Sequence, residues 1–103
     1  MSGFTPELLA RLCMLARRLR EENADFVDHH EDGQRWYNRG YANGMIRGLQ
    51  QLLGEQTPCD LKPDDEALLQ GHEVMAWGRA YLHGEQVGQK ETYEIAGLNS
   101  EDS

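Results

Sequence analysis

The chain has 103 residues, a formal net charge of −8 and a sequence pI of about 4.8. This length suits one small domain, and the surplus of acids disfavours long-range attraction to nucleic acid. No apolar run approaches the roughly 18 residues of a membrane-spanning helix, and the N-terminus lacks a signal-peptide pattern. We therefore expect one cytoplasmic helical domain over residues 1–96 and a disordered acidic tail over 97–103.

The first element is predicted to be an amphipathic helix over about 5–30. Thr5, Pro6 and Glu7 form a typical helix start, with a capping side chain, a proline at the first helical position and an early acid. The leucines recur at heptad-like spacing over positions 8, 12, 15 and 19. This stripe is expected to pack on the domain's own core, and the alternative is a homodimer through this helix.

The sequence after this stripe, His29-His30-Glu31-Asp32-Gly33, is expected to end the first helix, with Gly33 in the left-handed conformation. Two histidines and two acids suggest a metal site. Adjacent histidines on a helix point about 100° apart, however, so no metal and no cofactor is predicted.

The second helix is predicted over 34–53. Gly40, Gly44 and Gly48 lie four residues apart and share one helix face, which allows another helix to approach closely. The rival interpretation is a β-hairpin that turns at Asn43-Gly44. A second copy of the same pattern has a poor turn at His83-Gly84, which favours the helix.

A break over 54–63 precedes a third helix, predicted over 63–87. Asp64, Asp65 and Glu66 would occupy its first turn, where the helix dipole favours acids. Gly71 and Gly78 would lie on its inner face. Joined by a loop of ten residues, the second and third helices are expected to form an antiparallel pair that packs through its glycines. Residues 90–95 would be a short extended arm.

An internal repeat provides the candidate binding site. Arg39, Tyr41, Gly44 and Gly48 recur forty positions later as Arg79, Tyr81, Gly84 and Gly88. The residue types around the repeat are enriched at binding hot spots, although a small helical core uses them too. The predicted partner-binding residues are Trp36, Arg39, Tyr41, Asn43, Trp77, Arg79, Tyr81 and His83.

No catalytic pattern accompanies the repeat. The glycine spacing matches neither a phosphate-binding loop nor a dinucleotide fingerprint, and no nucleophile elbow occurs. Cys13 and Cys59 lack the spacing of a redox pair, and both thiols are expected to be reduced. The chain is therefore predicted not to be an enzyme.

The segment Arg39-Gly40-Tyr41-Ala42-Asn43-Gly44-Met45 resembles the helical segment of ribosome modulation factor and related small bacterial and phage proteins. The similarity extends over about 37–82. Pro58-Cys59 inverts the family's Cys-Pro dipeptide, and Trp77-Gly78 stands where the family has a second helix. The resemblance implies a two-helix core and association with ribosomal RNA, although this chain is acidic where the family is basic.

Two functions follow. The first is an acidic, non-enzymatic protein-binding module or inhibitor of a regulatory, phage-like type; one version would imitate nucleic acid with an array of Asp64, Asp65 and Glu66. The alternative is association with the ribosome or RNA. It requires Arg35, Arg39, Arg47 and Arg79 to be exposed and to converge on one basic face.

Overall fold

The computed structural model describes residues 5–54, 61–64 and 66–95. Within these residues it contains three α-helices, α1 (Pro6–Glu22), α2 (Gly33–Leu53) and α3 (Ala76–Ile95), and the short 3₁₀ segments η1 (Phe26–Asp28) and η3 (Glu66–Leu69). The predicted all-α, three-helix architecture is confirmed. Asn43 and Gly44 lie inside α2, so the hairpin alternative was wrong. The expected tail over 97–103 lies outside the described residues.

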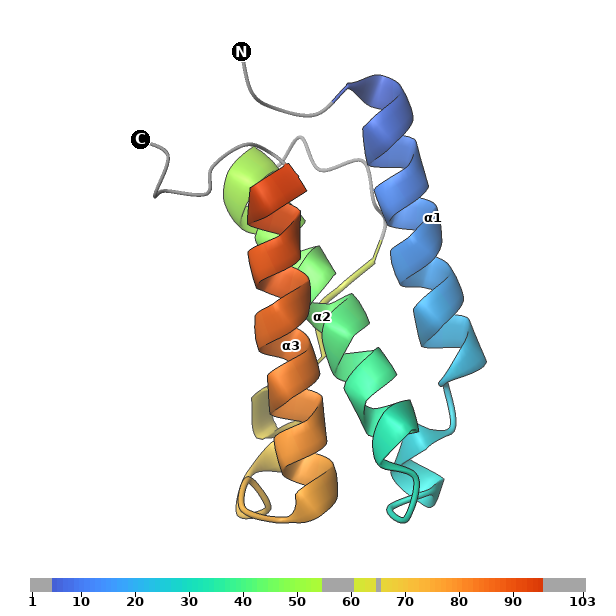
Figure 1. Cartoon of the computed structure of the whole chain (residues 1–103), viewed down its shortest axis with the longest axis vertical. Helices are drawn as coiled ribbons and strands as arrows, with labels where there is room; N and C mark the ends of the chain where they lie inside the picture. Colours follow the sequence, from blue (N-terminus) through green and yellow to red (C-terminus); the bar gives the residue numbers. More distant parts are fainter. Residues whose placement is uncertain (1–4, 55–60, 65, 96–103) are drawn as a thin grey trace.

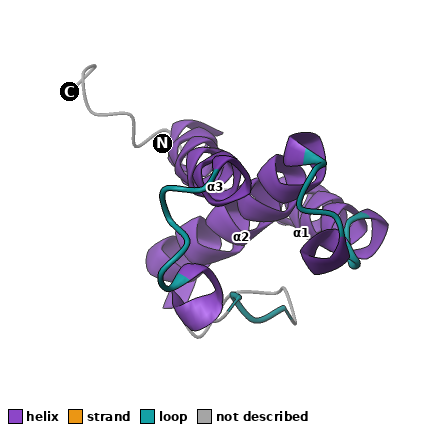
Figure 2. Ribbon diagram, turned by 90° about the horizontal axis from the view of Figure 1, so that it is seen from below, coloured by secondary structure: helices purple, strands orange, loops and turns teal. Residues whose placement is uncertain are grey.

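Helix α2 is the central element, with α1 packed on one side and α3 on the other (Figures 1 and 2). One hydrophobic core, built around Leu12, Ala16, Ile46 and Leu49, joins α1 to α2. A second core fills the space between η1, α2, η3 and α3. It contains Phe26, Trp36, Leu69 and Tyr81.

Helix α1 begins as predicted and ends earlier. Thr5 caps it by accepting a hydrogen bond from the Leu8 amide at 3.1 Å. The helix stops at Glu22, because Asn23 turns its side chain back onto the Leu19 carbonyl at 2.7 Å. Gly33 does not end this helix. It is instead the first residue of α2, with Asp32 as its cap.

Helices α2 and α3 pack backbone to backbone, as the glycine pattern predicted, but they run parallel. A Cβ added at Gly40 would overlap the Tyr81 carbonyl, and one at Gly44 would overlap the Glu85 carbonyl. Farther along α2, Gly48 meets Thr92. Contacts that advance together along both helices require the same direction (Figure 1). The predicted antiparallel arrangement was therefore wrong.

Parallel packing is possible because the connection between the two helices is long. Helix α3 starts at Ala76 and not at 63, so the chain from Gly54 to Met75 is available to return along the roughly 30 Å of α2. Its described part runs in that direction: Leu61 packs against the core that contains Leu49, and Leu69 belongs to the core that contains Trp36, near the start of α2. The prediction failed because it assigned part of this return segment to the third helix.

The glycines before and inside α3 also have roles that were not predicted. Gly71 lies in a turn with φ 81°, a conformation that favours glycine. Gly78 faces the His72 carbonyl and so lets that turn fold back on α3. Helix α3 continues to Ile95, and no extended arm forms over 90–95, because Thr92 is buried against Gly48 and bonds the Gly88 carbonyl at 2.8 Å.

The cysteines and the apolar character of the helices are the remaining features with a sequence-based expectation. Cys13 is disulfide-bonded, which corrects the expectation of a reduced thiol; the other cysteine, Cys59, lies outside the described residues. In the ranges that the structure describes, no helix combines the length and apolar character needed to cross a membrane.

Candidate functional site

The polar centre of the molecule is Asp64, in the return segment. Its side chain is only 9% exposed and lies between α1, α2 and α3. Arg39 binds both carboxylate oxygens, through Nε at 3.0 Å and Nη2 at 2.8 Å. The Tyr81 hydroxyl donates a third hydrogen bond at 2.7 Å, and Arg20 approaches at 3.3 Å. One carboxylate thus ties all three helices together.

Asn43 connects Asp64 to a second ion pair. Its side-chain oxygen accepts a hydrogen bond from the Asp64 amide at 2.6 Å, and its nitrogen donates to Glu85 at 2.7 Å. Glu85 also lies 3.0 Å from the Arg47 Nε, and Arg47 reaches the Asp64 carbonyl at 3.3 Å. The buried amide of Asn43 is therefore satisfied on both sides.

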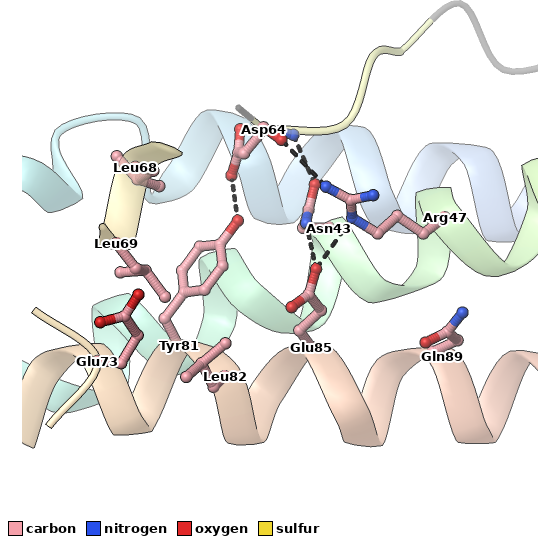
Figure 3. Close-up of a pocket in the computed structure, with 10 residues that line it drawn as sticks. All are labelled: Asn43, Arg47, Asp64, Leu68, Leu69, Glu73, Tyr81, Leu82, Glu85 and Gln89. Atoms are coloured by element: carbon pink, nitrogen blue, oxygen red, sulfur yellow. Dashed lines mark hydrogen bonds and ion pairs between the residues drawn. The ribbon is translucent and has the colours of Figure 1, made fainter. Parts of the chain in front are cut away.

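A cavity of about 350 Å³ opens beside this network (Figure 3). Asn43, Asp64 and Arg47 line one side of it, and Glu85 and Gln89 extend from α3 (Figure 3). Its apolar end is formed by three leucines and the Tyr81 ring, with the Glu73 carboxylate beside them. The leucines are Leu68, Leu69 and Leu82.

The charge of Asp64 is held by its partners. Burial by itself raises the pKa of this carboxyl, but hydrogen bonds from Arg39 and Tyr81 and the nearby Arg20 outweigh it and lower the pKa below 3.8. Burial and the Asp64 charge raise the pKa of Tyr81. At neutral pH Asp64 is an ionised hydrogen-bond acceptor and Tyr81 is a neutral donor.

A different kind of surface lies at the end of the bundle where α2 and α3 begin. Trp77, half-buried, contacts the fully buried Trp36 with ring centroids 4.4 Å apart. His30 stacks on Trp77 at 4.4 Å and 8°, and His72 lies 5.3 Å away. The adjacent Val74 and Met75 are 79% and 47% exposed. We call His30, His72, Val74, Met75 and Trp77 the Trp77 surface.

The eight predicted partner-binding residues do not share one surface. Trp36, Asn43 and Tyr81 are buried, and Arg39 is held by Asp64 with 14% of its side chain exposed. Tyr41 and Trp77 are half-buried. Arg79 and His83 are exposed, one turn apart on α3, and His83 contacts the Tyr37 ring at 5.5 Å.

The return segment explains why the two copies of the repeat differ. It covers Arg39 and Tyr81 and supplies Asp64 to both. Their counterparts meet other surroundings: Arg79 is exposed, and the Tyr41 hydroxyl bonds Glu91 on the exposed side of α3. Asp64 was considered only as a surface acid of a nucleic-acid mimic, and its place at the centre of the repeat residues was not predicted; nor were the stacking histidines. An acid that follows a proline resembles a helix start, so the sequence carried no signal that the side chain of Asp64 turns inward.

The histidine-rich corner separates into two arrangements. His29 lies between Asp25 and Glu31, at 3.1 and 3.3 Å, whereas His30 turns to Trp77. Over residues 5–54, 61–64 and 66–95, no group of three or more histidine, cysteine or acidic side chains is arranged to hold a metal ion.

Comparisons of the chain with known protein families, with curated proteins and with solved structures found no match.

Proposed function

We propose that this protein is a small, non-enzymatic binding module that docks a basic segment of another protein on the Trp77 surface. The observation that carries the proposal is an exposed apolar pair, Val74 and Met75, beside an aromatic group already fixed in place. Tryptophan and methionine are enriched at interface cores, and a preorganised anchor loses little entropy on binding.

The charges around this surface support a basic partner. Exposed acids adjoin it in sequence on both sides: Asp28 and Glu31 flank His30, and Glu73 lies between His72 and Val74. The whole chain carries −8. Such a field speeds encounter with a cationic segment and disfavours acidic ones.

The ribosome or RNA alternative has less support. It needs four arginines on one open basic face, and Arg39 is instead bound to Asp64. Arg35 pairs with Asp25 at 2.9 Å, and Arg47 lies 3.0 Å from Glu85. Of the four, Arg79 alone is exposed. The nucleic-acid-mimic version is also weakened, because the Asp64 side chain is only 9% exposed and is bound by Arg39; Asp65 and the Glu66 side chain lie outside the described residues.

The test uses two fluorescent amphipathic helical peptides with the same apolar face, one bearing lysine and the other glutamate on its polar face. Anisotropy should show that the lysine peptide binds and the glutamate peptide does not. Val74→Lys should weaken binding about tenfold or more, as expected for loss of one hot-spot contact. Ile95→Lys is the matched control, since Ile95 is 44% exposed at the opposite end of α3.

Equal loss in both lysine variants would show that only net charge matters and would contradict the proposed surface. Equal binding of the two peptides would contradict a basic partner. A second experiment is sedimentation with ribosomes at low salt. If the Val74→Lys variant still sedimented with ribosomes, the result would favour association with the ribosome or RNA. We also propose that the protein is cytoplasmic. Because disulfides are rare in the reducing cytosol, the disulfide at Cys13 makes thiol labelling in cells a direct test of this location.

A further inference from the structure

Helix α1 has an outward face that no other described element covers. Its inner face is used by the core, where Leu12 and Ala16 are buried. A second stripe faces away: Arg11, Leu15, Arg18 and Glu22, at spacings of four, three and four residues, are all exposed. Met14 flanks the stripe with 68% exposure, and Leu15 is 41% exposed. This spacing is the one that helices use to pair lengthwise.

We infer that this stripe pairs with the same stripe of a second copy of the chain, in antiparallel orientation about a two-fold axis between Leu15 and Arg18. The charge order along the helix selects this arrangement. With the axis there, Arg11 faces Glu22 of the other copy, and the reciprocal pair forms by symmetry. Leu15 then packs on the aliphatic part of Arg18 from the other copy.

Two other pairings of the same face bring like charges together, and a pair centred on Leu15 leaves Arg11 and Glu22 without opposite charges. In a parallel pair each arginine meets its own copy, and Glu22 meets Glu22. An antiparallel pair centred between Met14 and Leu15 places Arg11 against Arg18. The existing Arg18–Glu22 contact, at 3.2 Å with side chains 75% and 60% exposed, stays available as part of the intermolecular network.

The contact is small. Helix α1 has 17 residues and is therefore about 25 Å long, so one face of it buries less surface than a stable interface needs. The dimer is accordingly weak and forms as concentration rises. Because the helices are antiparallel, it presents two Trp77 surfaces at opposite ends, which would strengthen binding to a partner with two basic segments.

Sedimentation equilibrium of the full chain, over a wide micromolar range, tests the inference without any ligand. The wild type should pass from monomer to dimer. Arg11→Glu and Glu22→Arg should each weaken association about tenfold or more, because each creates two like-charge contacts across the axis. The double variant, Arg11→Glu with Glu22→Arg, should restore association because the pair is reversed on both sides.

Arg17→Glu is the matched control. It makes the same change of charge at an exposed position of α1 that lies off the stripe, and it should leave association unchanged. Circular dichroism checks that each variant is folded. A chain that stays monomeric throughout overturns the inference. So does a dimer that ignores these substitutions, or a double variant that fails to recover, because each outcome excludes this pairing. Binding of the basic peptide is measured separately and can fail or succeed independently.

Discussion

Asp64 is the residue on which the polar interior depends. With one partner removed, a buried ion pair leaves the other charge unpaired, at a cost of about 3 kcal/mol or more. We expect Asp64→Asn to lower the free energy of unfolding at pH 7 by about this amount, because Arg39 and Arg20 would lose their counter-charge. Glu22→Gln is the control; its partner Arg18 is 75% exposed, and the change should cost less than about 1 kcal/mol.

The effect of Asp64→Asn should depend on pH. The pKa of Asp64 is lower in the folded state than its ordinary value of 3.8. Its contribution is therefore full above pH 3.8 and is lost as the pH falls through the folded pKa. Urea unfolding at successive pH values should show the gap between wild type and Asp64→Asn closing below that range. If the difference in unfolding free energy between the two proteins stayed constant in acid, the charge of Asp64 would not be what stabilises the fold.

The two repeat tyrosines provide a second comparison at the residue scale. Tyr81→Phe removes a donor to the Asp64 carboxylate and should cost about 1.5 kcal/mol or more, the usual loss for a hydrogen bond to a charged group. Tyr41→Phe removes the equivalent hydroxyl, which bonds the exposed Glu91, and should cost clearly less. Equal costs in urea unfolding would contradict the different roles of the two copies.

At the scale of elements, the α2–α3 contact depends on the absence of side chains. Gly40→Ala should destabilise the domain by about 3 kcal/mol or more, because the new methyl group would meet the Tyr81 backbone and force the helices apart. Gly33→Ala, also in α2, has no neighbour within 4 Å and should be neutral or slightly stabilising. Thermal unfolding measures both; a tolerated alanine at position 40 would mean that the helices are not in backbone contact.

Much of the fold could be predicted from sequence because helix signals are local. The cap at Thr5, the 3.6-residue pattern over α2 and the small-residue face of the repeat all found their structural counterparts. The parallel direction of α2 and α3 was not predicted, because it depends on the length of the segment that joins them. Residues 67–75 have helix-like apolar spacing, but the positive φ of Gly71 breaks the helix there. Spacing alone does not reveal that turn.

The candidate site was less predictable. Whether an aromatic or arginine side chain lies in the core or at the surface depends on which side of the helix pair the return segment covers. Trp36 and Trp77 have similar sequence surroundings, yet Trp36 is fully buried and Trp77 lies half-exposed between two histidines. The histidines reach Trp77 from separate turns, a tertiary arrangement that no local pattern indicates.

For the whole molecule, the parallel pair explains how one short chain presents its surfaces. It brings the N-terminal ends of α2 and α3 to one end of the bundle (Figure 1), and the Trp77 surface forms there, around the first residues of α3. The helix dipoles then point the same way, and nearby acids offset their mutual repulsion. Asp32 caps α2, and Glu73 precedes α3. The proposed docking surface starts from this geometry.

Nuclear Overhauser contacts across the α2–α3 interface test the parallel arrangement most directly. In the parallel pair we expect contacts from the Gly40 α-protons to the Tyr81 backbone and from the Gly48 α-protons to the Thr92 methyl group. Both sets should be among the strongest between the helices, since no side chain separates them. Contacts from Gly40 to Thr92 and from Gly48 to Tyr81 would instead show an antiparallel pair and would contradict the account.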